Sequence, residues 1–379
     1  MNLGSVTKPV ARKAARNQHE SGGASEKFVL PLVSLLAAIQ IVWFYINRVP
    51  SYLNLKRYES GLERMPFQGR LLMVYPLRWA HDSPAMATMA ERFTATRLFL
   101  PRQLLPEDLV QGGIYLLCVL IAGLVARDLY HLHSRTRLLT PYVFPLALVM
   151  IAGSYCLGAL NFFRYLYDLP SLGFFSVGLY LIARKYHPAL FAILFAVATL
   201  NRESSLFLLF FFLLSSCVSE QQFVWRRALR WSSGGFTVLL ALCWIGWRIW
   251  TKQHFSGLPV EHGPGVLANV ASLIIPLTWP QLAGIAGYTI PFILVYRGEI
   301  RSTELRLWLK VFPVYFILMI YFGVLMEIRL FGEFIPMFAC AAVLLAEEHI
   351  LLRMKKLEPA LSPETDRDAG GLAQRVSVG

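Results

Sequence analysis

Apolar runs recur along almost the whole chain, and they restrict its fold more than any other feature. About 20 apolar residues in a helix cross a bilayer, and backbone groups inside hydrocarbon must be paired within the protein. With 56% hydrophobic and 16% charged residues, the chain is much more apolar than a typical soluble domain. The sequence therefore predicts an all-α, polytopic integral membrane protein.

We expect about ten transmembrane helices. The region 265–279, which lies between two of them, fits either a surface-lying helix or a re-entrant piece. The predicted spans are 28–46, 109–126, 140–160, 169–183, 188–201, 204–218, 232–250, 280–296, 311–326 and 334–352.

The predicted organisation is one membrane domain, residues 27–356, between two polar tails. Residues 1–26 and 357–379 are polar, and we expect disordered cytoplasmic tails there. The segment 48–108 is too polar to span, so we expect it to form the first extracytoplasmic loop, with interfacial helices.

The distribution of basic residues orients the predicted spans. If the N-terminus is cytoplasmic, the short inner loops carry twelve Lys and Arg, whereas the short outer stretches carry five. Cytoplasmic loops of membrane proteins are enriched in Lys and Arg, so both termini are expected in the cytoplasm. The net charge of +13 follows from the same bias, and it indicates a lipid bilayer rather than nucleic acid as partner.

Two charged residues interrupt the apolar sequence near the middle of the chain. Asn201-Arg202-Glu203 separates the apolar runs Pro188–Leu200 and Leu206–Val218, which predicts a helical hairpin with a polar tip. Ionisable residues at such positions are costly and commonly functional. The alternative is an ordinary interfacial turn in which Arg202 extends to lipid headgroups.

In the predicted orientation, unusual polar groups from distant segments fall on the outer face. This convergence is the main sequence argument for a functional site. The candidate substrate-binding residues are Gln68, Arg70, Asp168, Asn201, Arg202, Glu203, Glu327 and Arg329.

The first outer loop supplies the candidate catalytic acids. Glu59 and Glu63 are four residues apart and would share one helix face, where a carboxylate could act as a general base. Nine Lys and Arg accompany six acids in this loop, which suits an anionic headgroup or pyrophosphate. The alternatives are solvated acids and an amphipathic surface that lies on anionic lipid.

Other patterns are less specific. Asp168, two residues before Pro170, is also a good helix start, and internal salt bridges are an alternative role for Glu327 and Arg329. His81-Asp82 and Glu261-His262 lack the further ligands that a metal site needs, so no cofactor is expected. A divalent ion that binds together with a substrate phosphate is an alternative that the sequence leaves open.

These residues together resemble the GT-C superfamily of polytopic membrane glycosyltransferases, especially its uncharacterised bacterial members. The likeness covers most of the membrane part through short motifs. They are Glu59/Glu63 with Pro66-Phe67-Gln68-Gly69-Arg70, Tyr167-Asp168-Leu169-Pro170, Leu200-Asn201-Arg202-Glu203-Ser204 and Glu327-Ile328-Arg329-Leu330-Phe331.

The resemblance implies transfer of a sugar from a polyprenyl-phosphate-linked donor at the extracytoplasmic face of a bacterial cytoplasmic membrane. It also implies that an acid of the first outer loop is the base, for which Glu59 and Glu63 are nearest, although the paired acids common in that family are missing. Two other hypotheses stay open. One is a transporter or flippase of a lipid-linked or anionic substrate, and the other is a non-enzymatic subunit of an envelope assembly.

Overall fold

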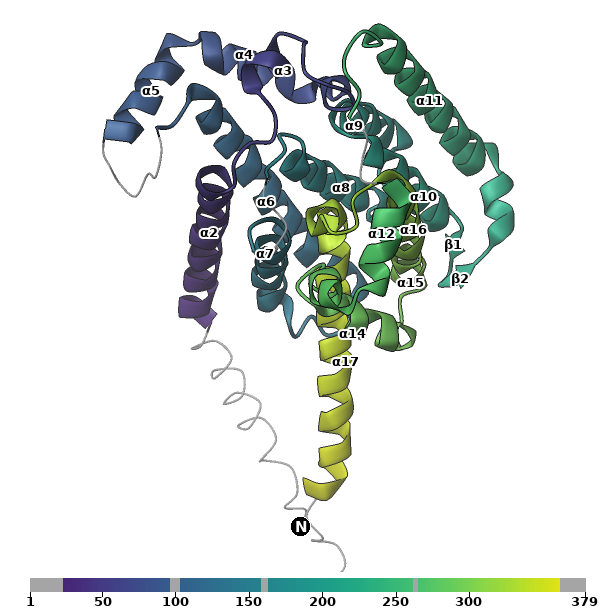
Figure 1. The fold of residues 1–379 in the computed structure, drawn as a ribbon. Coiled ribbons are helices and arrows are strands. Elements are labelled where there is room, and N and C mark those ends of the chain that lie inside the picture. The colour runs from purple at the N-terminus through teal and green to yellow at the C-terminus, as the bar shows by residue number, and fades with distance from the viewer. Residues whose placement is uncertain (1–22, 96–102, 158–162, 262–264, 362–379) are drawn as a thin grey trace, which may run out of the picture.

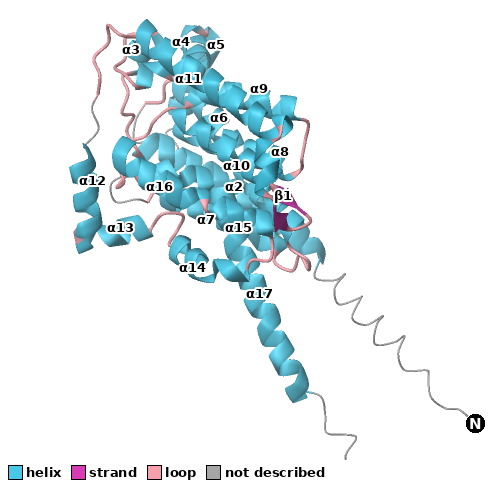
Figure 2. Ribbon diagram, turned by 90° about the vertical axis from the view of Figure 1, so that its right-hand side faces the viewer, coloured by secondary structure: helices cyan, strands magenta, loops and turns pink. Residues whose placement is uncertain are grey.

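The computed structural model describes residues 23–95, 103–157, 163–261 and 265–361, which are mostly helical (Figure 1, Figure 2). The longer helices are α2 (Gly23–Arg48), α6 (Pro106–His133), α7 (Thr140–Tyr155), α8 (Asp168–Ala183), α9 (Pro188–Asn201), α10 (Leu206–Ser216), α11 (Phe236–His254), α12 (Gly265–Ile274), α16 (Val311–Phe322) and α17 (Ile335–Leu361). The other regular elements are α3 (Leu55–Glu59), α4 (Val74–Asp82), α5 (Pro84–Ala95), α13 (Trp279–Ala283), α14 (Thr289–Tyr296), α15 (Thr303–Leu309), β1 (Val218–Ser219) and β2 (Gln222–Phe223). The predicted helical class is confirmed.

Within the described residues, five helical segments are long and apolar enough to cross a membrane. They are Phe28–Arg48, Pro106–His133, Trp231–His254, Thr303–Phe322 and Ile328–Leu351. The pair α12 and α13, bent by 88°, would make a sixth if it forms one broken span. These helices support an integral membrane protein. The predicted number of ten spans is not confirmed, because four of the predicted spans are helices of fewer than 18 residues.

The predicted span 280–296 is not one helix. Helix α13 ends at Ala283 and α14 begins at Thr289. Between them, Ala286, Gly287 and Tyr288 adopt positive φ angles, a conformation that ends a right-handed helix. Apolar composition alone therefore predicted a longer continuous helix than the backbone forms.

Two apolar helices of the fold have opposite environments. In the segment Ile328–Leu351, which contains the first part of α17, the whole of the most apolar 18-residue window is buried inside the protein. Only 6% of the corresponding window is buried in the segment Trp231–His254, which contains α11. Helix α17 packs against α6, α7 and α14, while α11 lies at the periphery (Figure 1). Lipid tails would therefore contact α11, whereas the side chains of α17 from Ile335 to Leu345 are enclosed by the protein.

Helices α6 and α8 form the most extensive helix contact of this core, and small residues permit their approach. A Cβ atom placed on Gly173 of α8 would lie 2.7 Å from Sγ of Cys118 in α6. Helices α9 and α10 both pack on α8, and Phe191 near the start of α9 stacks on Phe212 near the end of α10. The last contact requires an antiparallel arrangement, so the predicted hairpin is present.

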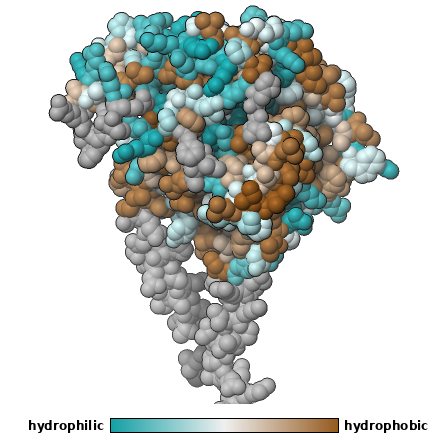
Figure 3. Space-filling view, viewed as in Figure 1, coloured by the Kyte–Doolittle hydropathy of each residue, from teal (hydrophilic) through white to brown (hydrophobic). Residues whose placement is uncertain are grey.

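The segment from α3 to α5 lies at one end of the molecule, next to the start of α6, whereas α2 begins and α17 ends toward the other end (Figure 1). Figure 3 shows hydrophilic residues gathered over the α3–α5 end and apolar residues around the middle. We call this the polar end. Helices do form within 48–108 as expected, and the cytoplasmic location of the termini stays a prediction.

The predicted tails fall largely outside the described residues. Residues 1–22 and 362–379 are not described, while α2 already begins at Gly23 and α17 continues to Leu361. Both helices therefore extend into the ranges predicted as tails.

Candidate functional site

Asp168 lies at the centre of a buried ionic network at the polar end. It begins α8 and is fully buried. Its Oδ1 atom lies 3.4 Å from Nη1 of Arg202, and its Oδ2 atom lies 3.0 Å from Nε of Arg329. The side chain of Arg329 also reaches Glu327 at 2.6 Å. The two predicted cationic segments, around 202 and 329, therefore meet at one carboxylate.

A second buried carboxylate, Glu333, completes this network. It accepts hydrogen bonds from the hydroxyl groups of Ser171 and Ser204 and lies 3.3 Å from Nη1 of Arg202. Residue Gly332 beside it packs against Tyr155 so closely that a Cβ atom would overlap the tyrosine hydroxyl. Arg202 is thus held between two acids inside the protein, and it does not extend to headgroups.

A more accessible pair of cations adjoins the buried network. Glu203, next to Arg202, accepts two contacts from Arg70, at 3.0 Å from Nε and 2.9 Å from Nη2. Its other oxygen lies 2.8 Å from Nη1 of Arg248 in α11. Their side chains are 12% exposed for Arg70, 24% for Glu203 and 29% for Arg248. The carboxylate of Glu203 therefore bridges two guanidinium groups near the surface.

Aromatic rings line the same region. The guanidinium of Arg70 lies 3.9 Å from the ring centroid of Tyr167, and that of Arg329 lies 4.5 Å from the ring of Tyr165. Phe67 packs between these tyrosines and Tyr52. Such cation–π contacts stabilise buried arginines and orient them without using their hydrogen-bonding edges.

Formal charges in this region balance. The four arginines are matched by four acids, with the most enclosed charges at Asp168 and Glu333 and the more open ones at Glu203 and Glu327. The network therefore grades from a closed ionic core to a more accessible rim.

Three predicted site residues instead fix the backbone around the network. Glu63 accepts the backbone N–H groups of Asn54 and Arg64, each at 3.1 Å. Gln68 accepts the N–H of Glu63 at 2.9 Å and donates to the Tyr58 carbonyl.

The third of these residues, Asn201, acts on the turn that precedes α8. Its amide donates to the carbonyl of Tyr167 at 3.0 Å. Because Asp168 follows Tyr167 directly, this hydrogen bond holds the backbone from which the central carboxylate projects.

Glu59 does not share a contact with Glu63, although the two are four residues apart. Helix α3 ends at Glu59, so the helical spacing assumed from the sequence stops before Glu63. Glu59 instead lies with His81 of α4 and Glu107 of α6, each offering a ligand atom within 4.8 Å of the others. The predicted pair of acids is therefore split between two environments.

An additional ion pair, missed in the sequence, ties the loop to the core. Arg164 and Asp108 are both buried, with Nη2 and Oδ1 2.7 Å apart, and Arg164 also donates to the carbonyl of Ile46. The backbone of Arg164 pairs with Pro50 and Tyr52. This cluster joins the end of α2, the start of α6 and the segment before α8.

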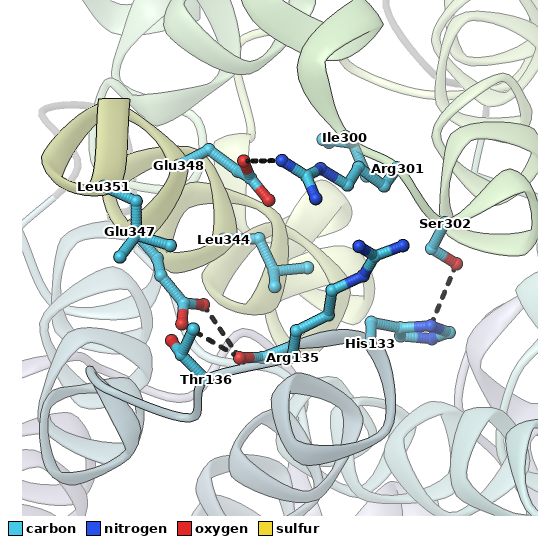
Figure 4. Close-up of a pocket in the computed structure, with 11 residues that line it drawn as sticks. His133, Arg135, Thr136, Ile300, Arg301, Ser302, Leu344, Glu347, Glu348 and Leu351 are labelled. Atoms are coloured by element: carbon cyan, nitrogen blue, oxygen red, sulfur yellow. Dashed lines mark hydrogen bonds and ion pairs between the residues drawn. The ribbon is translucent and has the colours of Figure 1, made fainter. Parts of the chain in front are cut away.

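A different cavity of about 250 Å³ lies at the far end of α6 (Figure 4). Among its lining residues, Glu347 accepts hydrogen bonds from Ser134, and Arg301 pairs with Glu348 at 2.8 Å. Helix α17 begins at Ile335, next to Glu333 of the network, and passes Glu347 of the cavity, so about 20 Å separates the two. Because the cavity and the network are that far apart, they are two separate sites.

Glu333 and Arg248 were not predicted as site residues, because each lies in or beside a predicted transmembrane span. Glu333 stands at the edge of the predicted span 334–352 and Arg248 within the span 232–250. A charged residue in or beside an apolar run is costly, so both are site candidates on the same ground as Arg202.

No family model, curated protein or solved structure matches the chain. The fold and site define an α-helical membrane protein with a buried ionic network at its polar end.

Proposed function

We propose that the protein is a membrane glycosyltransferase that uses a polyprenyl-phosphate-linked sugar donor at the polar end. The observation that carries the proposal is the bridged pair of guanidinium groups, Arg70 and Arg248, at the accessible rim of a charge-balanced core. The proposal places the polar end on the extracytoplasmic side, as the charge bias of the loops predicts.

The rim suits a phosphate group. Arginine recognises phosphate through paired N–H donors, and Arg70 directs two of its nitrogens, Nε and Nη2, at one oxygen of Glu203. A donor phosphate between Arg70 and Arg248 would take the place of the Glu203 carboxylate. The aromatic side chains of Tyr167 and Phe67 beside Arg70 would then offer apolar faces to the attached sugar.

Glu327 is the acid that we place as general base toward the acceptor hydroxyl. Its side chain is 25% exposed and pairs with Arg329 through Oε2. Burial raises the pKa of Glu327 above its ordinary value, with Arg329 opposing the shift. A raised pKa brings a carboxylate closer to the range that favours proton abstraction near neutral pH.

Glu59 and Glu63 stay alternatives for the base, as the resemblance implies. Both oxygens of Glu63 accept backbone N–H groups, which favours a role in holding the loop. Glu59 lies with His81 and Glu107, an arrangement that favours metal binding instead.

The test is transfer from radiolabelled polyprenyl-phosphate hexoses in membranes that contain the full chain. Arg70→Ala and Glu327→Gln should each lower transfer at least about 100-fold, the range for loss of a positioned charge or base. Arg301→Ala is the matched control, since this arginine pairs with Glu348 at the opposite end. The order of activity among Glu327→Gln, Glu59→Gln and Glu63→Gln identifies the base.

Unchanged transfer in both Arg70→Ala and Glu327→Gln would contradict the proposal, provided that both variants elute as folded protein. Free tolerance of substitutions throughout the polar end would instead favour a non-enzymatic subunit of an envelope assembly.

One feature favours the transporter alternative. Helices α12 and α13 are bent by 88° at a short break, and broken helices frame substrate sites in many transporters. Asn269 of α12 contacts the carbonyls of Met319, Ile320 and Gly323 at the end of α16. Accumulation of a labelled polyprenyl-phosphate sugar across proteoliposomes without any chemical transfer would support this function.

A further inference from the structure

We propose that Glu59, His81 and Glu107 form a binding site for one divalent transition-metal ion, Zn²⁺ or Mn²⁺. The three residues come from α3, α4 and the first turn of α6. Each offers one ligand atom, and the three atoms lie within 4.8 Å of one another. This inference does not depend on the proposed glycosyltransferase activity.

The two carboxylates have unused buried oxygens. Glu59 and Glu107 are both more than nine-tenths buried. Within the described part of the chain, Oε1 of Glu59 and Oε2 of Glu107 have no hydrogen-bond partner. A buried carboxylate oxygen without a partner is costly, and a bound cation would satisfy both oxygens at once.

The histidine completes a mixed ligand set. Nδ1 of His81 lies 2.8 Å from Oε1 of Glu107, and the side chain of His81 is 49% exposed. The exposed side gives an ion a path from solvent and leaves room for water as a further ligand. One imidazole and two carboxylates suit Zn²⁺ or Mn²⁺ better than the all-oxygen ligand sets typical of Ca²⁺ and Mg²⁺.

The charges around the cluster favour a cation. Asp82 adds a third negative charge near Glu59 and His81. Arg78, which donates to the carbonyl of Glu59, is the opposing positive charge. With His81 neutral, three acids and one arginine leave a formal charge of −2, which one divalent ion compensates.

The spacing requires only a small closure. Ligand atoms around a tetrahedral Zn²⁺ at about 2.1 Å from the metal are about 3.4 Å apart. The separations here are at most 4.8 Å, and rotation of the three side chains can shorten them to that distance. The bound ion would then join the loop helices α3 and α4 to the start of α6.

The experiment measures metal binding by the purified full chain in detergent after removal of metal. Zn²⁺ affinity is determined by competition with a chromophoric chelator, and Mn²⁺ binding by the loss of its free-ion electron paramagnetic resonance signal. We expect one equivalent to bind, and His81→Ala and Glu107→Gln each to weaken binding at least tenfold. Bound metal should also slow proteolysis within residues 60–73, between α3 and α4.

His349→Ala is the matched control, because His349 lies 3.2 Å from Glu299 at the opposite end of the molecule and should not affect binding. His81→Asn provides a second variant at the exposed position if His81→Ala fails to fold. Failure to bind Zn²⁺ and Mn²⁺, or binding that is the same in the His81 and Glu107 variants, would overturn the proposal. In His81→Ala, loss of metal binding with sugar transfer intact would support a metal site that is independent of the proposed activity. Retained metal binding in His81→Ala and Glu107→Gln would overturn the metal site, whatever their transfer activity.

Discussion

Replacing Asp168 with Asn would remove the one carboxylate that Arg202 and Arg329 share. The substitution keeps the side-chain volume but leaves the balanced network of four arginines with three acids. Breaking a buried ion pair by removing one partner costs about 3–5 kcal/mol. Because Arg202 keeps Glu333 at 3.3 Å and Arg329 keeps Glu327 at 2.6 Å, we expect the lower end, about 3 kcal/mol.

The chain offers a matched control for this prediction. Asp128 also pairs with an arginine, Arg184, with Oδ2 and Nε 3.0 Å apart, but the two side chains are 24% and 39% exposed. An exposed ion pair contributes about 0–1 kcal/mol, so Asp128→Asn should change stability little.

The assay is unfolding of purified protein in mixed micelles with increasing sodium dodecyl sulfate, followed by tryptophan fluorescence. The free energy of unfolding is compared among the parent chain, Asp168→Asn and Asp128→Asn. If the two variants lose the same stability within about 1 kcal/mol, the buried network is not what stabilises the polar end, and the reasoning is refuted.

Three further predictions follow from the packing and the charges. Gly332→Ala should destabilise the fold and alter the site, because its Cβ atom would overlap the hydroxyl of Tyr155; a normal melting temperature would contradict this. Asn269→Ala should cost at least about 2 kcal/mol in the same micelle assay, since it leaves buried backbone groups at the end of α16 unpaired. Zn²⁺ affinity should fall about tenfold per pH unit as pH drops below the pKa of His81, which its hydrogen bond to Glu107 raises above the ordinary value. Chelator competition between pH 6 and 8 measures this, and an affinity that does not change with pH would exclude His81 as a ligand.

The sequence by itself determined the helical class, the membrane character and the polar end. Apolar runs and the cost of charged residues within them are properties of composition, so they can be read without coordinates. The same reasoning proposed that these polar groups converge on one face of the membrane. It did not predict their pairing, in which Asp168 contacts both Arg202 and Arg329 and Glu203 contacts Arg70.

Only the tertiary structure decided how these groups pair. The sequence paired Glu59 with Glu63 by helical spacing, but α3 ends between them and Glu59 joins His81 and Glu107 instead. Contacts between α3, α4 and α6 set this pairing, and no local pattern encodes contacts between residues so far apart in the chain.

The environments of α11 and α17 could likewise be determined only from the tertiary structure. The segments that contain them, Trp231–His254 and Ile328–Leu351, are both apolar enough to cross a membrane. Yet 6% of the most apolar window of the first is buried and 100% of that of the second. Hydropathy records transfer out of water and is nearly the same whether the new surroundings are lipid tails or neighbouring side chains. Which helix contacts lipid, and which forms the centre of the protein, therefore depends on packing alone.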